Sequence, residues 1–248
     1  MKRFGLIGHP VAGSLSPRLF EAAYGGRYAY DLLEGADFSA SWQRFLDGYD
    51  GINITAPFKQ DAFRAVDELS EDARLCGAVN LAVKTSRGIV GYNTDVDGVI
   101  LAVREVGFPT PETPGSPMPE ALVVGCGGAG RAAAVAALRL GCHVTLTNRT
   151  SSRAAALASD LLCAWTPLPD LASIQPDLVI YPVPGQMEGL PEFPKAVILE
   201  ANYRTPCLEG HGRPYISGLR WLLYQAVAGY SIFTGETPDA DAMFRIFC

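Results

Sequence analysis

The sequence predicts an α/β fold, and three observations carry that prediction. Short apolar stretches alternate with stretches of helical periodicity along the chain, which is typical of strands and helices packed in layers. The glycine-rich segment GCGGAG at 125–130 follows an apolar stretch and precedes an alanine-rich one, as in nucleotide-binding units. The length of 248 residues, with 48% hydrophobic and 19% charged residues, suits one large or two modest globular domains.

The first part of the chain is expected to alternate strand and helix and then to form a hairpin. Each apolar run is followed by a helical pattern, and the turn Ser86-Arg87 separates the last two strands. In chain order, the expected elements are a strand at 4–8, a helix at 17–24, a strand at 29–33, a helix at 38–46, a strand at 51–55, a helix at 58–65, strands at 78–84 and 88–92, and a helix at 97–106.

A proline-rich stretch at 108–119 predicts a surface loop or linker, because closely spaced prolines exclude regular structure. The alternation then resumes, and Gly141 is expected to stop the alanine-rich helix. The expected elements are strands at 121–124, 143–147, 178–181 and 196–199, and helices at 131–140, 151–161, 219–230 and 240–247.

The segment GHPVAGSLSP at 8–17 places two serines where the first strand should give way to a helix. Ser16 is a favourable N-cap residue, and Pro17 suits the first helical position, where a missing N–H costs nothing. A cap requires only one hydroxyl. Ser14, two residues back, would point to the same side of an extended chain. We therefore expect the two hydroxyls to lie together, for a reason that capping does not supply.

The segment at 125–130 is a complete G-x-G-x-x-G and predicts a dinucleotide site, with a purely structural glycine turn as the alternative. Its glycines permit a tight turn and a close approach of backbone to pyrophosphate, which would sit on the N-terminus of the following helix. The candidate cofactor-binding residues in this loop are Gly125, Gly127, Gly128, Ala129 and Gly130.

The end of the next strand indicates which dinucleotide is bound. NAD sites usually carry an acid there for the ribose 2′-hydroxyl, whereas this chain has TNRT at 147–150, with Arg153 shortly after. Arg149 suits a 2′-phosphate through its bidentate geometry, which favours NADP(H); the alternative is a solvated loop arginine. The further cofactor candidates are therefore Asn148, Arg149, Thr150 and Arg153.

Polar residues follow several of the expected strands. Lys59 and Asp95 each come shortly after a strand, and Asn80 lies in GAVN at 77–80. Polar groups at the carboxyl ends of strands converge on one crevice. These three residues are candidates for a shared site. The alternative is a surface lysine and an N-cap aspartate.

Charge and cysteine usage exclude several functions. A net charge of −6 disfavours a general nucleic-acid or anionic-membrane surface, so an anionic ligand must be held by local groups. Six scattered cysteines without a CxxC pair and three isolated histidines predict reduced thiols and no metal site. No signal-peptide pattern or membrane-spanning apolar run is visible, which predicts a cytoplasmic protein.

The ordered motifs closely resemble the shikimate dehydrogenase family over nearly the whole chain. The motifs are GHPVAGSLSP, NITAPFK, GAVN, GYNTD, GCGGAG, NRT and GLRWLLYQ. The resemblance implies two α/β domains, with the C-terminal helices returning to the first. Residues 1–95 plus 219–248 would form an N-terminal substrate-binding domain, and residues 96–218 a Rossmann-type NADP-binding domain. It also implies a monomer or homodimer.

The same resemblance implies an activity and roles for residues. The family reduces 3-dehydroshikimate to shikimate with NADPH. Lys59 and Asp95 would be the catalytic pair, and Ser14 and Ser16 would bind the substrate carboxylate. The remaining expected contacts are Thr55, Asn80 and Gln225 to the ring hydroxyls, Tyr203 in the substrate pocket and Gly218 at the cofactor.

The sequence departs from the family pattern at three places: Gly13 stands where a histidine is usual, Tyr181-Pro182-Val183 replaces Asn-Ala-Thr, and Arg220-Trp221 replaces Gly-Met. Trp221 is alternatively a core aromatic. Two other functions are alternatives. One is a quinate-type dehydrogenase acting on a related cyclic hydroxy acid, which an NAD preference would favour. The other is a non-catalytic ligand-binding regulator, which loss of Lys59 or Asp95 would have favoured.

Overall fold

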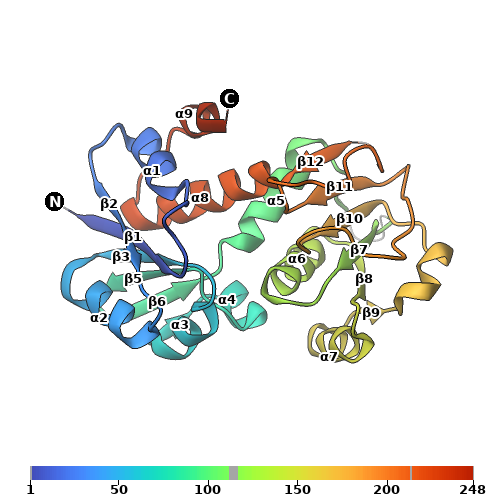
Figure 1. The fold of residues 1–248 in the computed structure, drawn as a ribbon, viewed down its shortest axis with the longest axis horizontal. Helices are drawn as coiled ribbons and strands as arrows, with labels where there is room; N and C mark the ends of the chain where they lie inside the picture. The colour runs from blue at the N-terminus through green and yellow to red at the C-terminus, as the bar shows by residue number, and fades with distance from the viewer. Residues whose placement is uncertain (1, 112–116, 213, 248) are drawn as a thin grey trace. The chain divides into compact units, whose positions relative to one another are not determined.

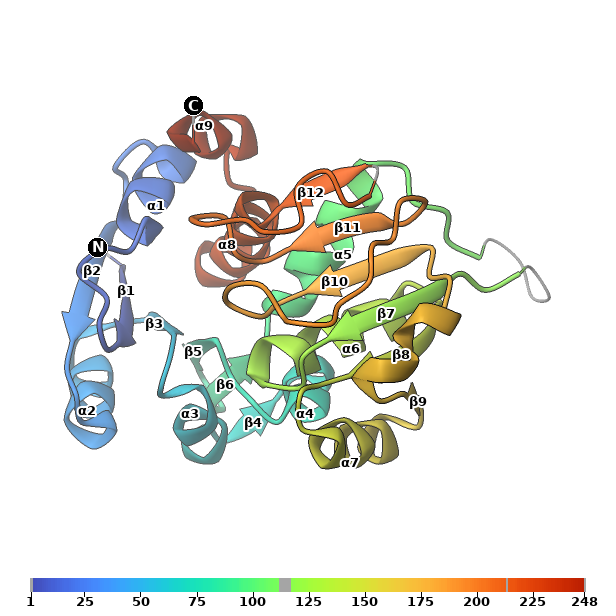
Figure 2. The same ribbon diagram turned by 45° about the vertical axis from the view of Figure 1, so that its right-hand side comes forward.

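The computed structural model describes residues 2–111, 117–212 and 214–247, and the chain forms two compact α/β units (Figures 1 and 2). The first contains the chain up to Thr94 together with the part from Gln225 onward, and the second runs from Asp95 to Tyr224. The sequence-based division placed residue 95 and residues 219–224 in the first domain, so the two divisions differ there. The boundaries of the functional domains stay a prediction.

The first unit is built on a six-stranded sheet in the order β2-β1-β3-β5-β6-β4. Strand β1 pairs in parallel with β2 and β3, β3 pairs antiparallel with β5, and β5 and β6 form the expected hairpin. The elements are β1 (Arg3–Gly8), α1 (Ser16–Tyr24), β2 (Ala29–Glu34), α2 (Phe38–Gly48), β3 (Gly51–Ile54), α3 (Lys59–Ala65), β4 (Glu68–Leu69), α4 (Glu71–Cys76), β5 (Leu81–Thr85) and β6 (Gly88–Tyr92).

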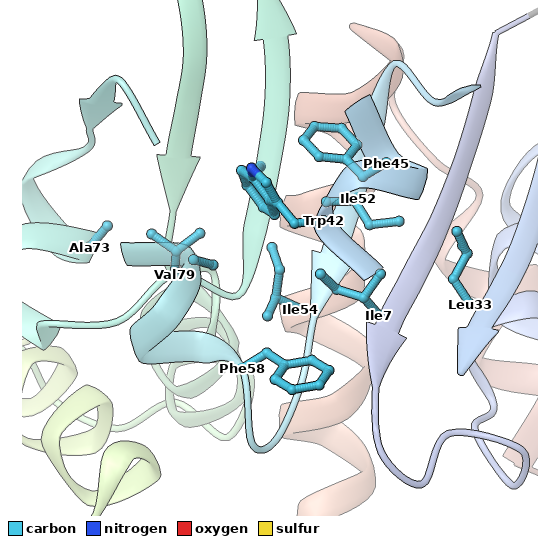
Figure 3. Close-up of a cluster of buried hydrophobic side chains, with 11 residues drawn as sticks. Ile7, Leu33, Trp42, Phe45, Ile52, Ile54, Phe58, Ala73 and Val79 are labelled. Atoms are coloured by element: carbon cyan, nitrogen blue, oxygen red, sulfur yellow. The ribbon is translucent and has the colours of Figure 1, made fainter. Parts of the chain in front are cut away.

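Alternation along the strands gives this sheet two different apolar faces. One face carries aliphatic side chains, such as Ile7, Ile52 and Ile54, which pack with Trp42 and Phe45 of α2 (Figure 3). The other face carries Phe4, whose ring packs against Phe20 of α1 and stacks on Phe233. The loop that carries Ser14 follows the carboxyl end of β1, and Thr55 follows the carboxyl end of β3.

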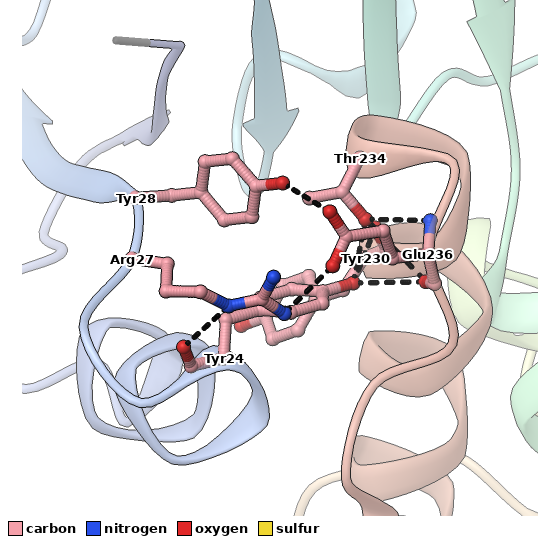
Figure 4. Close-up of polar contacts among 6 residues, drawn as sticks. All are labelled: Tyr24, Arg27, Tyr28, Tyr230, Thr234 and Glu236. Atoms are coloured by element: carbon pink, nitrogen blue, oxygen red, sulfur yellow. Dashed lines mark hydrogen bonds and ion pairs between the residues drawn. The ribbon is translucent and has the colours of Figure 1, made fainter.

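The C-terminal part of the chain returns to the first unit through α8 (Gly218–Thr234), followed by α9 (Ala240–Phe244) and a short 3₁₀ turn (Arg245–Phe247). A hydrogen-bonded cluster joins this return to the end of α1, as Figure 4 shows. Glu236 accepts hydrogen bonds from Arg27 Nη2 and Tyr28 Oη, both at 2.6 Å, and Tyr24 Oη donates to the Tyr230 carbonyl at 2.8 Å. The expected helix at 240–247 is thus divided into a helix and a 3₁₀ turn.

The second unit contains a parallel six-stranded sheet in the order β12-β11-β10-β7-β8-β9. The chain moves outward from β7 through β8 to β9 and then crosses to β10 on the other side of β7. This reversal makes the carboxyl ends of β7 and β10 a topological switch point, where ligands of such sheets bind. The elements are α5 (Asp95–Glu105), β7 (Glu120–Val124), α6 (Gly128–Arg139), β8 (His143–Thr147), α7 (Ser151–Leu161), β9 (Ala164–Trp165), a 3₁₀ turn (Leu168–Ser173), β10 (Leu178–Tyr181), β11 (Val197–Glu200) and β12 (Tyr215–Ser217).

The expected loop at 108–119 is confirmed where the structure describes it: residues 108–111 and 117–119 carry no helix or strand, and 112–116 lie outside the described residues. In the described part of the chain, no helix is long and apolar enough to cross a membrane.

Candidate active site

The two predicted serines lie together at the start of α1. Ser14 Oγ donates to Ser16 Oγ at 3.0 Å and accepts from the Ser16 backbone N–H at 3.2 Å. The expectation that Ser16 caps the helix is wrong, because Leu15 occupies the N-cap position and Ser16 and Pro17 are the first two helical residues. Ser14 instead bonds the first helical N–H, so the two hydroxyls point to one place beside a helix N-terminus.

The loop that carries the serines is tied to neighbouring strands. The Ala12 N–H donates to Glu34 Oε2 at the end of β2 (3.1 Å), and the His9 N–H donates to the Ala56 carbonyl (3.1 Å). A Cβ added to Gly8 would overlap Thr55 Cγ2, so Thr55 packs directly against the beginning of this loop. The serine loop and Thr55 therefore lie at the same edge of the sheet.

Backbone pairing brings Lys59 and Asn80 to the same region. The Val79 N–H donates to the Lys59 carbonyl at 2.9 Å, and the Ile54 N–H donates to the Asn80 carbonyl at 2.8 Å. Lys59 is the first residue of α3, directly after the loop that carries Thr55. The sequence predicts that Lys59, Asn80 and Asp95 share a site, and these contacts bring the backbones of Lys59 and Asn80 together beside β3. The place of Asp95 in that site stays a prediction.

Asn80 is 3% exposed and is held by Thr94, a residue that the sequence reasoning did not select. Its Oδ1 accepts from the Thr94 N–H at 2.8 Å, and its Nδ2 donates to Thr94 Oγ1 at 3.1 Å. A Cβ on Gly229 of α8 would meet Thr94 Oγ1 at 3.4 Å, one helical turn after Gln225. Asp95 follows Thr94 directly and begins α5 in the second unit.

The glycine-rich loop has the backbone that its motif predicts. Gly125 has φ +103°, a conformation that favours glycine, and a Cβ on Gly130 would overlap the Gly125 carbonyl. Gly127 and Gly128 face open space, since an added Cβ would meet nothing within 4 Å. Helix α6 begins at Gly128, and Gly127 supplies no side-chain cap. Its first N–H groups are therefore suited to an anion.

Asn148 joins this loop to the loop after β8. Its Oδ1 accepts from the Cys126 N–H at 3.2 Å, and its Nδ2 donates to the Thr150 carbonyl at 3.0 Å. Arg149 and Arg153 are exposed beside it at the start of α7. The structure thus gives Asn148 a positioning role and leaves two exposed cations next to the glycine loop. Gly218, the remaining cofactor candidate, packs closely, because a Cβ there would overlap the Ala201 carbonyl.

Tyr203 lies in a loop organised by Glu200, which the sequence reasoning also missed. Glu200 is fully buried at the end of β11, and its carboxylate accepts from the Cys207 and Leu208 N–H groups (2.8 and 3.0 Å) and from Tyr215 Oη (2.9 Å). Burial and the hydrogen bond to Glu200 raise the pKa of the Cys207 thiol to about 11. No local sequence pattern distinguishes this acid from a surface glutamate.

Three residues of the second unit that depart from the family pattern have structural roles. Tyr181 is buried, and its hydroxyl donates to the Gly185 carbonyl at 2.7 Å, which fixes the loop that follows β10. Arg220 pairs with Glu105 at 3.0 Å, and Trp221 is 6% exposed, in agreement with the alternative of a core aromatic. In the described ranges, no group of three or more His, Cys, Asp or Glu side chains could hold a metal.

The second unit is a parallel α/β nucleotide-binding unit, with its glycine loop at the switch point of the sheet. Residues 6–82 of the first unit match the family described as the shikimate dehydrogenase substrate binding domain. A shikimate dehydrogenase (NADP(+)) of Acidiphilium cryptum is 35% identical over 97% of this chain and 94% of its own length. One of Haloarcula marismortui is 36% identical over 98% and 97%. The chain belongs to the shikimate dehydrogenase family.

Solved structures agree with this assignment. The shikimate 5-dehydrogenase of Thermus thermophilus, in complex with NADP(H) and shikimate, superposes with a TM-score of 0.85 at 29% identity, covering 99% of this chain and 98% of that one. A quinate dehydrogenase of Corynebacterium glutamicum in complex with NAD gives a TM-score of 0.85 at 26% identity, with the same coverage.

Proposed function

We propose that this protein catalyses the reversible NADPH-dependent reduction of 3-dehydroshikimate to shikimate. The observation that carries the proposal is the near-full-length relationship to NADP-dependent shikimate dehydrogenases. The serine pair beside the N-terminus of α1 and the glycine loop before α6 supply a suitable anion site in each unit. The function places the chain in the biosynthesis of aromatic amino acids.

NADP(H) is the proposed cofactor. The open side of the glycine loop suits the pyrophosphate, and Arg149 and Arg153 suit the 2′-phosphate of the adenosine ribose. The end of β8 and the loop after it read Thr147-Asn148-Arg149 and hold no acid that would bind a free 2′-hydroxyl. When bound, NADPH supplies the hydride for the ketone carbon.

The proposed substrate site binds an anion through local donors. Ser14 and Ser16 would donate to the carboxylate of 3-dehydroshikimate, where the free N–H groups and the dipole of α1 favour a negative charge. This arrangement explains how a chain of net charge −6 can bind an acid. We assign Thr55, Asn80, Gln225 and Tyr203 to the ring hydroxyls and the surrounding pocket.

Lys59 is the proposed acid that protonates the ketone oxygen during hydride transfer. Its ammonium group can donate both a hydrogen bond and a proton, and a neighbouring carboxylate favours that charged form. We assign this supporting role to Asp95. In the reverse direction, Lys59 would accept the proton of the shikimate hydroxyl.

A quinate-type dehydrogenase is the second candidate, because a quinate dehydrogenase bound to NAD matches as well in fold. Arg149 disfavours it, since a guanidinium in that position suits NADP(H) better than NAD. Both Lys59 and Asp95 are present, which disfavours a regulator without catalysis. We further expect the protein to act in the cytoplasm on small molecules, as a monomer or a homodimer.

The test is steady-state oxidation of NADPH and of NADH with 3-dehydroshikimate, and the reverse reaction with shikimate and with quinate. We expect turnover with NADPH and 3-dehydroshikimate, and a much lower kcat/KM with NADH. Preferred oxidation of quinate with NAD would favour the second candidate. A folded protein that turned over none of these pairs would exclude both dehydrogenase assignments.

A further inference from the structure

A buried set of polar side chains connects two parts of the proposed substrate site in the first unit. Tyr230 of α8 is 2% exposed, and its hydroxyl donates to the Ser16 carbonyl at 3.0 Å. Tyr30 of β2 donates to Asn53 Oδ1 at 2.8 Å. These groups occupy the sheet face that otherwise packs Phe4, Phe20 and Phe233, so polar atoms there require a reason.

The two tyrosines form the junction of this set. Their ring centroids are 6.0 Å apart at an interplanar angle of 60°. Both phenols also interact with the Ser16 side chain, which lowers their pKa values against a larger rise caused by burial. Because burial dominates, both hydroxyls remain neutral at physiological pH. No phenolate therefore forms near the serines that are proposed to hold an anion.

Asn53 extends the connection to the other side of the site. Its Nδ2 donates to the Asn80 carbonyl at 3.3 Å, and the Asn80 side chain is in turn bound to Thr94. Asn53 and Asn80 are 8% and 3% exposed, so neither amide depends on bulk water for its partners. The chain of contacts therefore runs from α1 through α8, β2 and β3 to the start of β5.

We propose that Tyr30, Asn53 and Tyr230 are positioning residues that hold the serine pair and Asn80 at a fixed separation. The inference rests on the proposed function, in which Ser14 and Ser16 bind the carboxylate and Asn80 a ring hydroxyl. A rigid cyclic acid gains most from contacts whose spacing is set before it binds. When every polar group of a buried network is hydrogen-bonded, a displacement of any of these side chains would leave a buried polar group without a partner. Such a network therefore fixes the spacing of the residues that it connects.

The test compares two substitutions that each remove one buried phenol oxygen from the same pair of helices. Tyr230→Phe removes the donor to Ser16. Tyr24→Phe is the matched control, because the Tyr24 hydroxyl bonds groups of α8 rather than the serine pair. It donates to the Tyr230 carbonyl and accepts from Thr234 Oγ1 (Figure 4). Both variants should melt at a lower temperature than the parent.

We expect Tyr230→Phe to raise the KM for shikimate roughly three- to tenfold, with the KM for NADP⁺ unchanged. Tyr30→Phe, which breaks the bond to Asn53, should act in the same direction. Tyr24→Phe should leave both KM values at the parental level. Equal KM values for shikimate in Tyr230→Phe and Tyr24→Phe would overturn the proposal.

Crystal structures of the two variants separate this inference from the proposed function. The serine pair should depart from its 3.0 Å Oγ–Oγ contact in Tyr230→Phe and keep it in Tyr24→Phe. If the parental protein turned over neither shikimate nor 3-dehydroshikimate, the proposed function would fail, and this comparison would still decide the positioning role. An unchanged serine pair in Tyr230→Phe would refute it.

Discussion

Lys59 carries the proton transfer in the proposed reaction, and its position makes a selective test possible. It is the first residue of α3, and on the same helix Asp61 pairs with Arg64. Lys59→Ala should lower kcat on the order of 10²- to 10⁴-fold and change the KM for shikimate little, because the lost group acts mainly in the transition state. Steady-state kinetics of the purified variant measure both parameters.

Lys84→Ala is a suitable control for Lys59→Ala, since Lys84 is an exposed lysine of the same unit whose Nζ donates to the Leu46 carbonyl. It should leave kcat unchanged. A Lys59→Ala variant with kcat within a few-fold of the parent and only weaker binding would show that another group supplies the proton.

Arg149 is expected to determine the choice between the two nicotinamide cofactors. Arg149→Ala should raise the KM for NADPH about 10-fold or more, because a charge-assisted contact to the 2′-phosphate is lost. The KM for NADH should stay as it was, so the second cofactor provides the control within one variant. If both cofactors weakened equally, Arg149 would instead stack on the shared adenine or stabilise the loop.

Single residues also mark the limit of what the sequence predicts. The sequence predicts that the Ser14 and Ser16 hydroxyls lie together, and they are in contact in the structure. The extended chain assumed for that prediction is wrong, because Leu15 between them has a helical backbone. The capping role of Ser16 was wrong, because the preceding Leu15 closes the first turn and places Ser16 inside the helix. Glu200 and Tyr230 escaped detection because their partners are set by tertiary packing.

At the scale of elements, length and periodicity decide what can be predicted. The longer strands and helices of both sheets appear within a few residues of the expected bounds. The two-residue strands β4 and β9 and the short helix α4 were missed, since such elements depend on neighbours far away in the chain. Helix α6 begins at Gly128, three residues before the expected start, because the glycine loop itself forms its first turn.

The strand-end loop around Glu200 is the element whose stability we expect to affect function most. Asn202 Nδ2 donates to the Thr205 carbonyl at 2.7 Å and closes a turn around Tyr203, and Glu200 then binds the two N–H groups that follow. Glu200→Gln should cost about 2 kcal/mol of unfolding free energy, because one charged acceptor becomes a donor facing buried N–H groups.

The functional effect of Glu200→Gln should accompany that loss of stability. If Tyr203 lines the substrate pocket, a loosened loop raises the KM for shikimate, which kinetics and urea unfolding measure in parallel. Glu209→Gln, at an exposed glutamate of the same loop region, is the control and should change neither quantity. A destabilised Glu200→Gln variant with a parental KM would separate the loop from substrate binding.

At the scale of the whole molecule, the chain leaves the first unit after Thr94 and returns to it along α8. The resemblance to a known family predicted this return, whereas hydrophobic periodicity could not. The contacts that establish it join residues about two hundred positions apart, such as Tyr24 with Thr234. They bring Tyr230 beside Ser16, so the far end of the chain contributes to the carboxylate site proposed at its beginning.

The contacts of Glu236 with Arg27 and Tyr28 should make the stability of the first unit sensitive to acid. Hydrogen bonds from Tyr28 and Arg27 lower the pKa of Glu236 below its ordinary value of 4.5. A carboxylate whose pKa is lower in the folded state stabilises the fold above its unfolded pKa, and this contribution is lost as the pH falls through the folded pKa. Glu236→Gln should therefore melt below the parental protein at pH 7, and the two melting temperatures should converge as the pH falls below about 4.5 and through the lowered pKa of Glu236. Calorimetric unfolding across that range measures the difference; a constant gap would mean that Glu236 acts through packing rather than charge.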